Sequence, residues 1–191
     1  MSVADMAAGQ ARGLRVSLQT SCRFYFDGIL LASGIFVQTF VNIFTGDANA
    51  PDLSDSTSGA FKCALFTTMP TAIQLQTATT YNAFGTEHAA TGNYTTGGIV
   101  VPNSGPAPTF TNSDNNVYWD IADVAFTGTG ASDLTVSGVN GCVIYQDSKT
   151  GDPPVVAIDF ATPQSVTIGR LTVSWAVPGA TGGVFYVDLA V

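Results

Sequence analysis

The sequence predicts a mainly β protein, with an antiparallel β-sandwich or jelly-roll-like body that follows an N-terminal arm and one amphipathic helix. Two observations support this fold class. Short apolar or alternating runs recur from residue 59 onward, at the spacing of sandwich strands. Polar but uncharged loops, rich in Thr, Gly and Asn, separate these runs. We therefore divide the chain into an arm and helix over 1–45, an acidic linker over 46–58 and a β-sandwich body over 59–191.

The composition indicates a folded domain whose surface is largely covered by other protein. Apolar residues make up 46% of the 191 residues, which excludes a disordered tail. Charged residues make up only 10%, whereas an ordinary soluble domain has about 25%. Because a free monomer usually keeps its surface solvated with charged side chains, this shortage predicts self-association or assembly with other proteins. The net charge of −8 argues against contact with nucleic acid.

Charge is distributed unevenly between the arm and the body. The first 25 residues contain Arg12, Arg15 and Arg23 against Asp5 alone, a net charge of 3 − 1 = +2. The other 166 residues hold three positive and 13 negative side chains, a net charge of 3 − 13 = −10. The arm is either a solvated terminus or a segment that docks on an acidic neighbour, including another copy of this chain.

Residues 34–45 are predicted to form the amphipathic helix, and a second helical piece before Gly28 remains open. Apolar residues recur here with helical spacing and form one stripe: Ile29, Phe36, Val37, Phe40, Val41 and Phe44. Gln38, Thr39, Asn42 and Thr45 lie away from that stripe. We expect the stripe to pack on the body or on a partner. The candidate docking residues are therefore Arg12, Arg15, Arg23, Phe36, Phe40, Val41 and Phe44.

A membrane span over 24–44 is not expected, although this segment is long enough to cross a bilayer. Asp27, Gln38 and Asn42 interrupt the apolar run. We predict that the helix is a packing element and that the protein has no membrane partner.

The acidic linker over 46–58 precedes the first predicted strand of the body. Turn residues and aspartates fill this segment, and the apolar period changes from helical to alternating after it. Within 117–126 the alternation shifts phase, which predicts a β-bulge. The predicted strands cover 61–66, 99–101, 117–126, 134–136, 141–145, 155–160, 170–175 and 184–189. Long polar loops are expected over 67–80, 85–96 and 102–116, and loops of this length are functional or disordered.

Residues that carry catalytic chemistry are scarce. Glu87 and His88 are the single glutamate and the single histidine, and they stand next to each other in a predicted loop. An acid–base pair needs a nucleophile or a second carboxylate in reach, and adjacent residues of an extended loop point in opposite directions. We therefore expect a solvated loop or a subunit contact here, and no enzyme.

Candidate residues for metal and sugar binding are present but lack a defining pattern. Cys22, Cys63 and Cys142 lack the spacing of zinc ligands and are expected to be small buried hydrophobes. Oxygen ligands for Ca²⁺ are offered by Asp114, Asn115, Asn116, Asp120, Asp123 and Asp133, without the spacing of an EF-hand. An aromatic platform for sugars would use Tyr81, Phe84, Tyr94, Tyr118 and Trp119, although most are expected in the core or in subunit contacts. We predict no metal and no cofactor.

Several sequence blocks carry a resemblance that covers most of the body. In order they are FKCALFTT, TTYNAFGTEHAATGNYTTGGIVV, YWDIADVAFTG, GCVIYQD, VVAIDF and RLTVSWA. In order and spacing they resemble small structural proteins of tailed bacteriophages, from about residue 59 to the end. None of these blocks is a catalytic motif, and the arm departs from the pattern.

The resemblance implies a non-enzymatic virion protein, made in the host cytoplasm. The expected role is capsid decoration or cement at joints between major capsid proteins, as a homo-oligomer and preferably a trimer. The acidic body favours the outer capsid surface, because the inside faces packaged DNA. Two alternatives stay open: a tail or head-to-tail component, and a carbohydrate-binding β-sandwich that acts as an adhesin or lectin.

Overall fold

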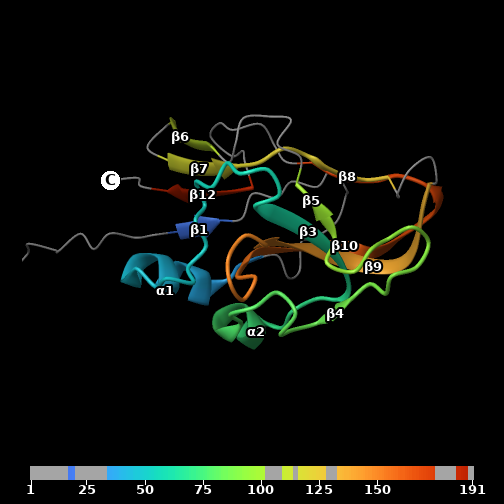
Figure 1. Ribbon diagram of the computed structural model, residues 1–191, viewed down its shortest axis with the longest axis horizontal. Coiled ribbons are helices and arrows are strands. Elements are labelled where there is room, and N and C mark those ends of the chain that lie inside the picture. Colours follow the sequence, from blue (N-terminus) through green and yellow to red (C-terminus); the bar gives the residue numbers. More distant parts are fainter. Residues whose placement is uncertain are drawn as a thin grey trace, which may run out of the picture.

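The computed structural model has a mainly antiparallel β architecture with two short helices (Figure 1). It describes residues 17–19, 34–101, 109–113, 116–127, 133–174 and 184–188. In chain order the elements are β1 (Ser17–Gln19), β2 (Gly34–Ile35), α1 (Val37–Thr45), β3 (Phe61–Thr68), α2 (Ala72–Thr77), β4 (Thr86–Glu87), β5 (Ile99–Val100), β6 (Thr109–Ser113), β7 (Asn116–Asp120), β8 (Val124–Phe126), β9 (Leu134–Gln146), β10 (Pro154–Gly169), β11 (Leu171–Val173) and β12 (Phe185–Asp188).

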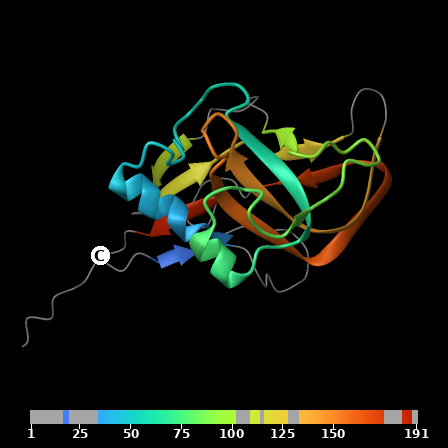
Figure 2. The ribbon, with the colours of Figure 1, turned by 60° about the horizontal axis from the view of Figure 1, so that its bottom comes forward.

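The main sheet has the strand order β2-β10-β9-β3-β4, with β5 also paired to β3. Every pair is antiparallel, and residues 61–66 of β3 lie opposite residues 146–141 of β9. The long strands β9 and β10 curl, so the sheet follows about half of a barrel (Figure 2). Register shifts in their pairing accompany this curvature, as bulges do in other curled sheets.

The central strands of the main sheet are buried on both faces, which explains their continuous apolar runs. In β3, Cys63 and Leu65 join the larger core cluster, while Ala64 and Phe66 join the smaller cluster on the opposite face. The same alternation places Cys142, Ile144, Val156 and Ile158 in the larger cluster and Val143, Tyr145 and Ala157 in the smaller one. The predicted burial of Cys63 and Cys142 is confirmed, and Cys22 lies outside the described residues.

A second, smaller sheet has the order β1-β12-β7-β6, and β8 pairs separately with β11. Trp119 of β7 is fully buried in the larger core cluster, where its ring meets Phe61 edge-on at 5.5 Å between centroids. Val124 and Phe126 of β8 enter the same cluster. The larger core is therefore shared between the main sheet, β7 and β8.

Most predicted strands lie where the structure has strands, but their predicted lengths and divisions differ from the observed ones. The sequence predicts one bulged strand over 117–126, but this segment forms β7 and β8, which belong to different sheets. The phase shift marks a break at residues 121–123, where the chain leaves one sheet for the other. The segments 134–136 and 141–145, predicted as separate strands, are one continuous strand, β9. β6 lies within the predicted loop 102–116.

The prediction was wrong about where the first helix begins, and it missed the second helix. The first begins at Val37 and not at residue 34, because Gly34 and Ile35 pair with β10 as strand β2. The second, α2, lies in the segment predicted as the loop 67–80. It begins with a capping box, in which Thr71 accepts a hydrogen bond from the Gln74 backbone N–H and the Gln74 side chain accepts one from the Thr71 N–H.

The predicted acidic linker has no helix or strand from residue 47 to residue 60, yet it packs against the body. Leu53 is buried in the larger core cluster, and its carbonyl accepts a hydrogen bond from Trp119 Nε1 at 2.9 Å. The fully buried Gln146 accepts a hydrogen bond from the Asp52 N–H at 2.7 Å and donates one to Asp55 Oδ2 at 2.9 Å. These contacts make the segment part of the folded body.

Candidate functional site

The strongest candidate for a functional surface lies on the two helices. Six large apolar side chains of the described residues are exposed, and four of them belong to α1 and α2. These four are Val37, Val41, Phe44 and Ile73, and we call this surface the α1–α2 face. The two helices contact each other, and α2 lies next to the end at which α1 begins (Figure 2). The exposed fractions reach 83% for Phe44 and 72% for Ile73.

The body holds α1 firmly from its inner side. Phe36, the N-cap residue, is fully buried against Phe84 at 4.8 Å between ring centroids, and its N–H donates to the Val155 carbonyl at 3.1 Å. The buried Thr39 hydroxyl donates to the Pro154 carbonyl. At the other end, Gly46 adopts a left-handed conformation that ends the helix. The exposed side chains therefore project from a fixed support.

The predicted docking residues divide between buried and exposed positions. Phe36 is in the core and is not available for docking, and the half-buried Phe40 packs against the larger core cluster. Val41 and Phe44 are exposed as the docking prediction requires. Thr39, expected on the polar side, is instead buried, because its hydroxyl finds a carbonyl partner in the body. Arg12, Arg15 and Arg23 lie outside the described residues.

The α1–α2 face has no charged side chain of its own. The sequences of α1 (VQTFVNIFT) and α2 (AIQLQT) contain no Asp, Glu, Lys or Arg. A partner would therefore bind this face through apolar contact, which releases about 1.5–3 kcal/mol for each large side chain that becomes fully buried. Sequence reasoning missed Ile73, although the capping box T-x-x-Q at 71–74 is a readable signal for the helix that presents it.

Glu87 is half-buried and His88 is buried within a hydrogen-bonded and aromatic network, so these two side chains are not fully solvated; the alternative of a subunit contact stays a prediction. His88 is only 6% exposed, and its ring meets Tyr94 edge-on at 5.4 Å between centroids. Glu87 Oε1 accepts hydrogen bonds from the Tyr94 hydroxyl at 2.8 Å and from the Gly97 N–H at 2.6 Å. Tyr94 also accepts the Leu65 N–H at 2.9 Å. The network fastens the segment after β4 onto β3.

The proposed aromatic platform is not a surface feature. Phe84, Tyr94 and Trp119 are buried, and the side chain of Tyr118 lies outside the described part of the structure. Tyr81 stacks on Tyr145 at 3.9 Å between centroids, and the Tyr145 hydroxyl donates to the Gly97 carbonyl at 2.7 Å. Burial raises the pKa of the Tyr145 phenol well above its usual range. Tyr81 and Tyr145 pack on the outer face of the main sheet, and Tyr81 is the part-exposed ring among the described members of the proposed platform.

The structure offers no grouped ligand set for calcium among the residues it describes. Desolvation by burial raises the pKa of Asp120, and the negative charge of nearby Asp123 adds to this rise. Asp114 and Asn115 lie outside the described residues, and Asp133 is exposed near the start of β9.

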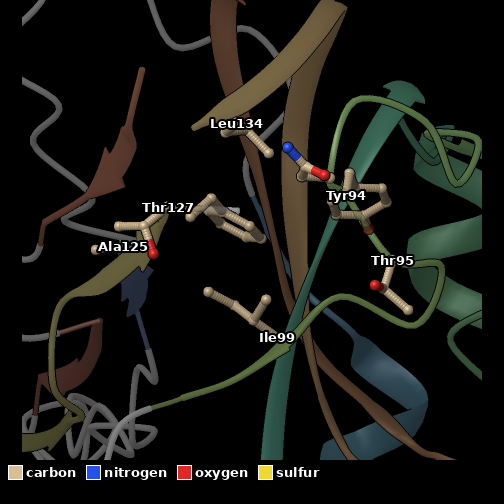
Figure 3. A pocket seen from close by; sticks show the side chains of 8 residues that line it. Tyr94, Thr95, Ile99, Ala125, Thr127 and Leu134 are labelled. Atoms are coloured by element: carbon tan, nitrogen blue, oxygen red, sulfur yellow. The ribbon is translucent and has the colours of Figure 1, made fainter. Parts of the chain in front are cut away.

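A small pocket opens between β8 and the segment that leads into β5 (Figure 3). It has a volume of about 60 Å³, and Ala125 and Thr127 face Tyr94 and Thr95 across it. Drug-sized ligands occupy pockets of roughly 300–1,000 Å³. This pocket has room for a few water molecules and is a packing gap between the two sheet regions.

Comparisons with protein-family models, with curated proteins and with solved structures found no match to this chain. Within the described residues, neither helix has the length and hydropathy that crossing a bilayer requires.

Proposed function

We propose that this chain is a non-enzymatic structural protein of a bacteriophage virion. Its proposed role is that of a capsid decoration or cement protein that binds across joints between major capsid proteins on the outer surface. The single observation that carries the proposal is the α1–α2 face. It presents exposed Val41, Phe44 and Ile73 on charge-free helices that the body holds in place. The sequence blocks from residue 59 onward, which resemble phage structural proteins, supply the class of particle.

The charge balance supports an attachment driven by apolar contact and repeated many times. Only 20 of 191 residues are charged (6 basic and 14 acidic), so little of the surface is specialised for solvation. Many weak, identical contacts multiply through avidity when copies are linked in one oligomer. We propose a homo-oligomer, with three-fold symmetry as the preferred form, because closed symmetry satisfies such surfaces without open ends. We further propose that the body is a β-sandwich related to the jelly rolls, since one core lies between the main sheet, β7 and β8.

The first experiment is a reconstruction of intact particles of the phage that encodes this chain. We expect repeated copies at joints of the capsid, in contact with the major capsid protein through α1 and α2. A ring of copies stacked along a tail, or copies at the head-to-tail junction, would replace decoration by the tail alternative. Absence of the chain from purified particles would overturn the virion proposal altogether.

The second experiment tests the docking surface in a binding assay with particles that lack the chain. The variants Val41→Asp and Phe44→Asp place a charge on the α1–α2 face, and we expect at least a tenfold loss of particle binding. The matched control is Val100→Asp on β5, because Val100 is 42% exposed and Val41 is 44% exposed. Equal binding of both sets of variants would contradict docking through this face.

A further inference from the structure

A polar hollow forms where the segment after β4 meets the far ends of β9 and β10. It has a volume of about 220 Å³ and takes its lining from three segments. The lining residues are His88, Thr91 and Gly92 from the segment after β4, Thr135, Val136 and Ser137 from β9, and Ser165 and Thr167 from β10. No residue in this lining carries a carboxylate, an ammonium or a guanidinium group.

The walls of the hollow are fixed before any ligand arrives. β3 pairs with residues 141–146 of β9, and the segment 88–93 takes over the same edge further along the strand. The Asn93 side chain donates to the Asp133 carbonyl at 3.0 Å, and the Thr135 N–H donates to the Gly92 carbonyl at 2.7 Å. These bonds hold the segment at a constant distance from β9, so the hollow is preorganised.

Four hydroxyl groups lie together on the outer face of β9 and β10. Along β9, Leu134 and Val136 are buried while Thr135 and Ser137 are exposed. Val136 pairs with Val166, the register shifts on either side of this pair, and the hydroxyl residues Thr135, Ser137, Ser165 and Thr167 all line the hollow. Their close spacing provides a row of groups that both donate and accept hydrogen bonds.

Part of this hydrogen-bonding capacity is not used within the described part of the protein. Thr135 Oγ1 accepts the Ile168 N–H at 3.2 Å, and Ser165 Oγ accepts the Gly138 N–H at 3.1 Å. Both hydroxyls are therefore positioned by the backbone and retain their own hydrogen for donation. The hydroxyls of Ser137 and Thr167 form no hydrogen bond to another described residue and are available to a ligand.

His88 adds a buried acceptor to the row. Its Nδ1 lies 2.8 Å from the Ala89 carbonyl, which only accepts, so Nδ1 carries the hydrogen and Nε2 carries the lone pair. Nε2 faces the Ser137 N–H at 3.4 Å, which is a long contact. This contact uses the single lone pair of Nε2, so a ligand hydroxyl can donate to Nε2 only by displacing the Ser137 N–H.

From this arrangement we infer that the hollow binds a neutral, hydroxyl-bearing ligand, namely one pyranose ring of a saccharide. The lining offers several matched donors and acceptors and no countercharge, which selects against anionic and cationic ligands. The volume lies below the range of roughly 300–1,000 Å³ found for drug-sized ligands, and this suits a single ring. Beside the hollow, Ile168 is 73% exposed with φ = +52°, a costly conformation for a β-branched residue and one that is enriched at functional sites. This inference does not rest on the proposed virion role.

The test is ligand-observed NMR on the full chain with the methyl α-pyranosides of glucose, galactose and mannose. Methyl glucuronide serves as the charged comparison. A ligand of this size is expected to bind with a Kd of about 1–10 mM. The double variant Ser137→Ala, Thr167→Val removes the two available hydroxyls and should raise the Kd roughly tenfold, since two hydrogen bonds are lost. The matched control Thr172→Val, on the exposed side of β11, should leave the Kd unchanged.

Three results would overturn the inference. They are no saturation transfer to any of the three neutral pyranosides, equal Kd values for the double variant and the control, and tighter binding of the glucuronide than of the neutral sugars. Circular dichroism of the double variant checks that it is folded, and the single variants replace it if it is not. Loss of sugar binding with normal particle binding would leave the proposed function intact.

Discussion

Phe40 and Phe44 stand one helical turn apart on α1, with ring centroids 6.1 Å from each other, yet their surroundings differ. Phe40 packs against the larger core cluster, whereas 83% of Phe44 is exposed. Together with Val37 and Val41, Phe44 makes an exposed stripe that the folding of the described residues does not explain. Isolated exposed apolar residues are ordinary, but a stripe of them on one helix, with a further one on the helix that it contacts, indicates an interaction surface.

The first prediction separates folding from docking on α1. Phe36→Ala empties a fully buried site and should lower the free energy of unfolding by about 3–5 kcal/mol. Phe44→Ala should change it by less than about 0.5 kcal/mol, because the side chain is exposed. Urea denaturation of both variants measures these changes. A large loss of stability in Phe44→Ala would show that this side chain belongs to the core, which would contradict the docking interpretation.

The sequence predicted the apolar central parts of the strands. It did not predict the polar ends, which are strands only because they pair with a neighbouring strand. The run VVAIDF at 155–160 identifies the buried part of β10, but the strand continues through polar residues to Gly169. Those residues are held mainly by pairing with β9, and Val166 is the one of them that packs against the larger core cluster, so the apolar signal there is weak. The break between β7 and β8 was visible only as a phase shift, which a bulge would also produce.

The candidate site was predicted in part, because periodicity identifies an amphipathic helix without fixing which side faces the core. Thr39 satisfies its hydroxyl on the Pro154 carbonyl, which turns a polar position inward and leaves Val41 outside. The hydroxyl row had a local signal in the alternation LTVS at 134–137 and SVT at 165–167. Its meeting with His88 depends on the fold of the segment after β4, which no local pattern reveals.

The second prediction concerns Gln146 and the segment 46–58. The Gln146 side chain is fully buried and bonds to the Asp52 N–H and to Asp55 Oδ2. Gln146→Met keeps the volume but leaves the Asp52 N–H without its partner, at a cost of about 1–3 kcal/mol. Limited proteolysis should then cut the segment faster than in the wild type.

The control for this variant is Gln164→Met, since the Gln164 side chain bonds only to nearby Thr162 among the described residues. Unchanged cleavage in Gln146→Met would mean that Leu53 and its bond from Trp119 hold the segment without help from Gln146.

The third prediction is a pH dependence at Asp120. Desolvation, with a contribution from the Asp123 charge, raises the pKa of Asp120 above its usual value of 3.8. A raised carboxyl pKa in the folded state means that the folded protein holds its proton longer than the unfolded chain. Stability from this group is therefore present below pH about 3.8 and is lost as the pH rises through the folded-state pKa. Asp120→Asn should remove that loss and stabilise the protein at pH 7.

Thermal unfolding from pH 3 to pH 7 measures this effect, with the exposed Asp133→Asn as the control for the change in net charge. Asp120→Asn should gain stability relative to the control only at the upper end of this range. An equal gain for both variants would assign the effect to overall charge and not to the burial of Asp120.

The last prediction tests the junction that forms the hydroxyl hollow. Gly92 has φ = +56°, and a Cβ at this position would overlap the Thr135 carbonyl oxygen, which is backbone and cannot rotate away. Gly92→Ala must therefore separate the segment 88–93 from β9 and break the hydrogen bond between the Thr135 N–H and the Gly92 carbonyl.

Gly138 is the matched control, because it also has a positive φ, +65°, but a Cβ added there would meet no atom within 4 Å. Gly138→Ala should therefore cost only about 1–2 kcal/mol of conformational strain. We expect Gly92→Ala to cost at least about 2 kcal/mol more than the control, a further fall of about 4–8 °C in Tm for a chain of this length. Equal Tm values for the two variants would show that the segment 88–93 is not held against β9, and the preorganised hollow would then be lost with it.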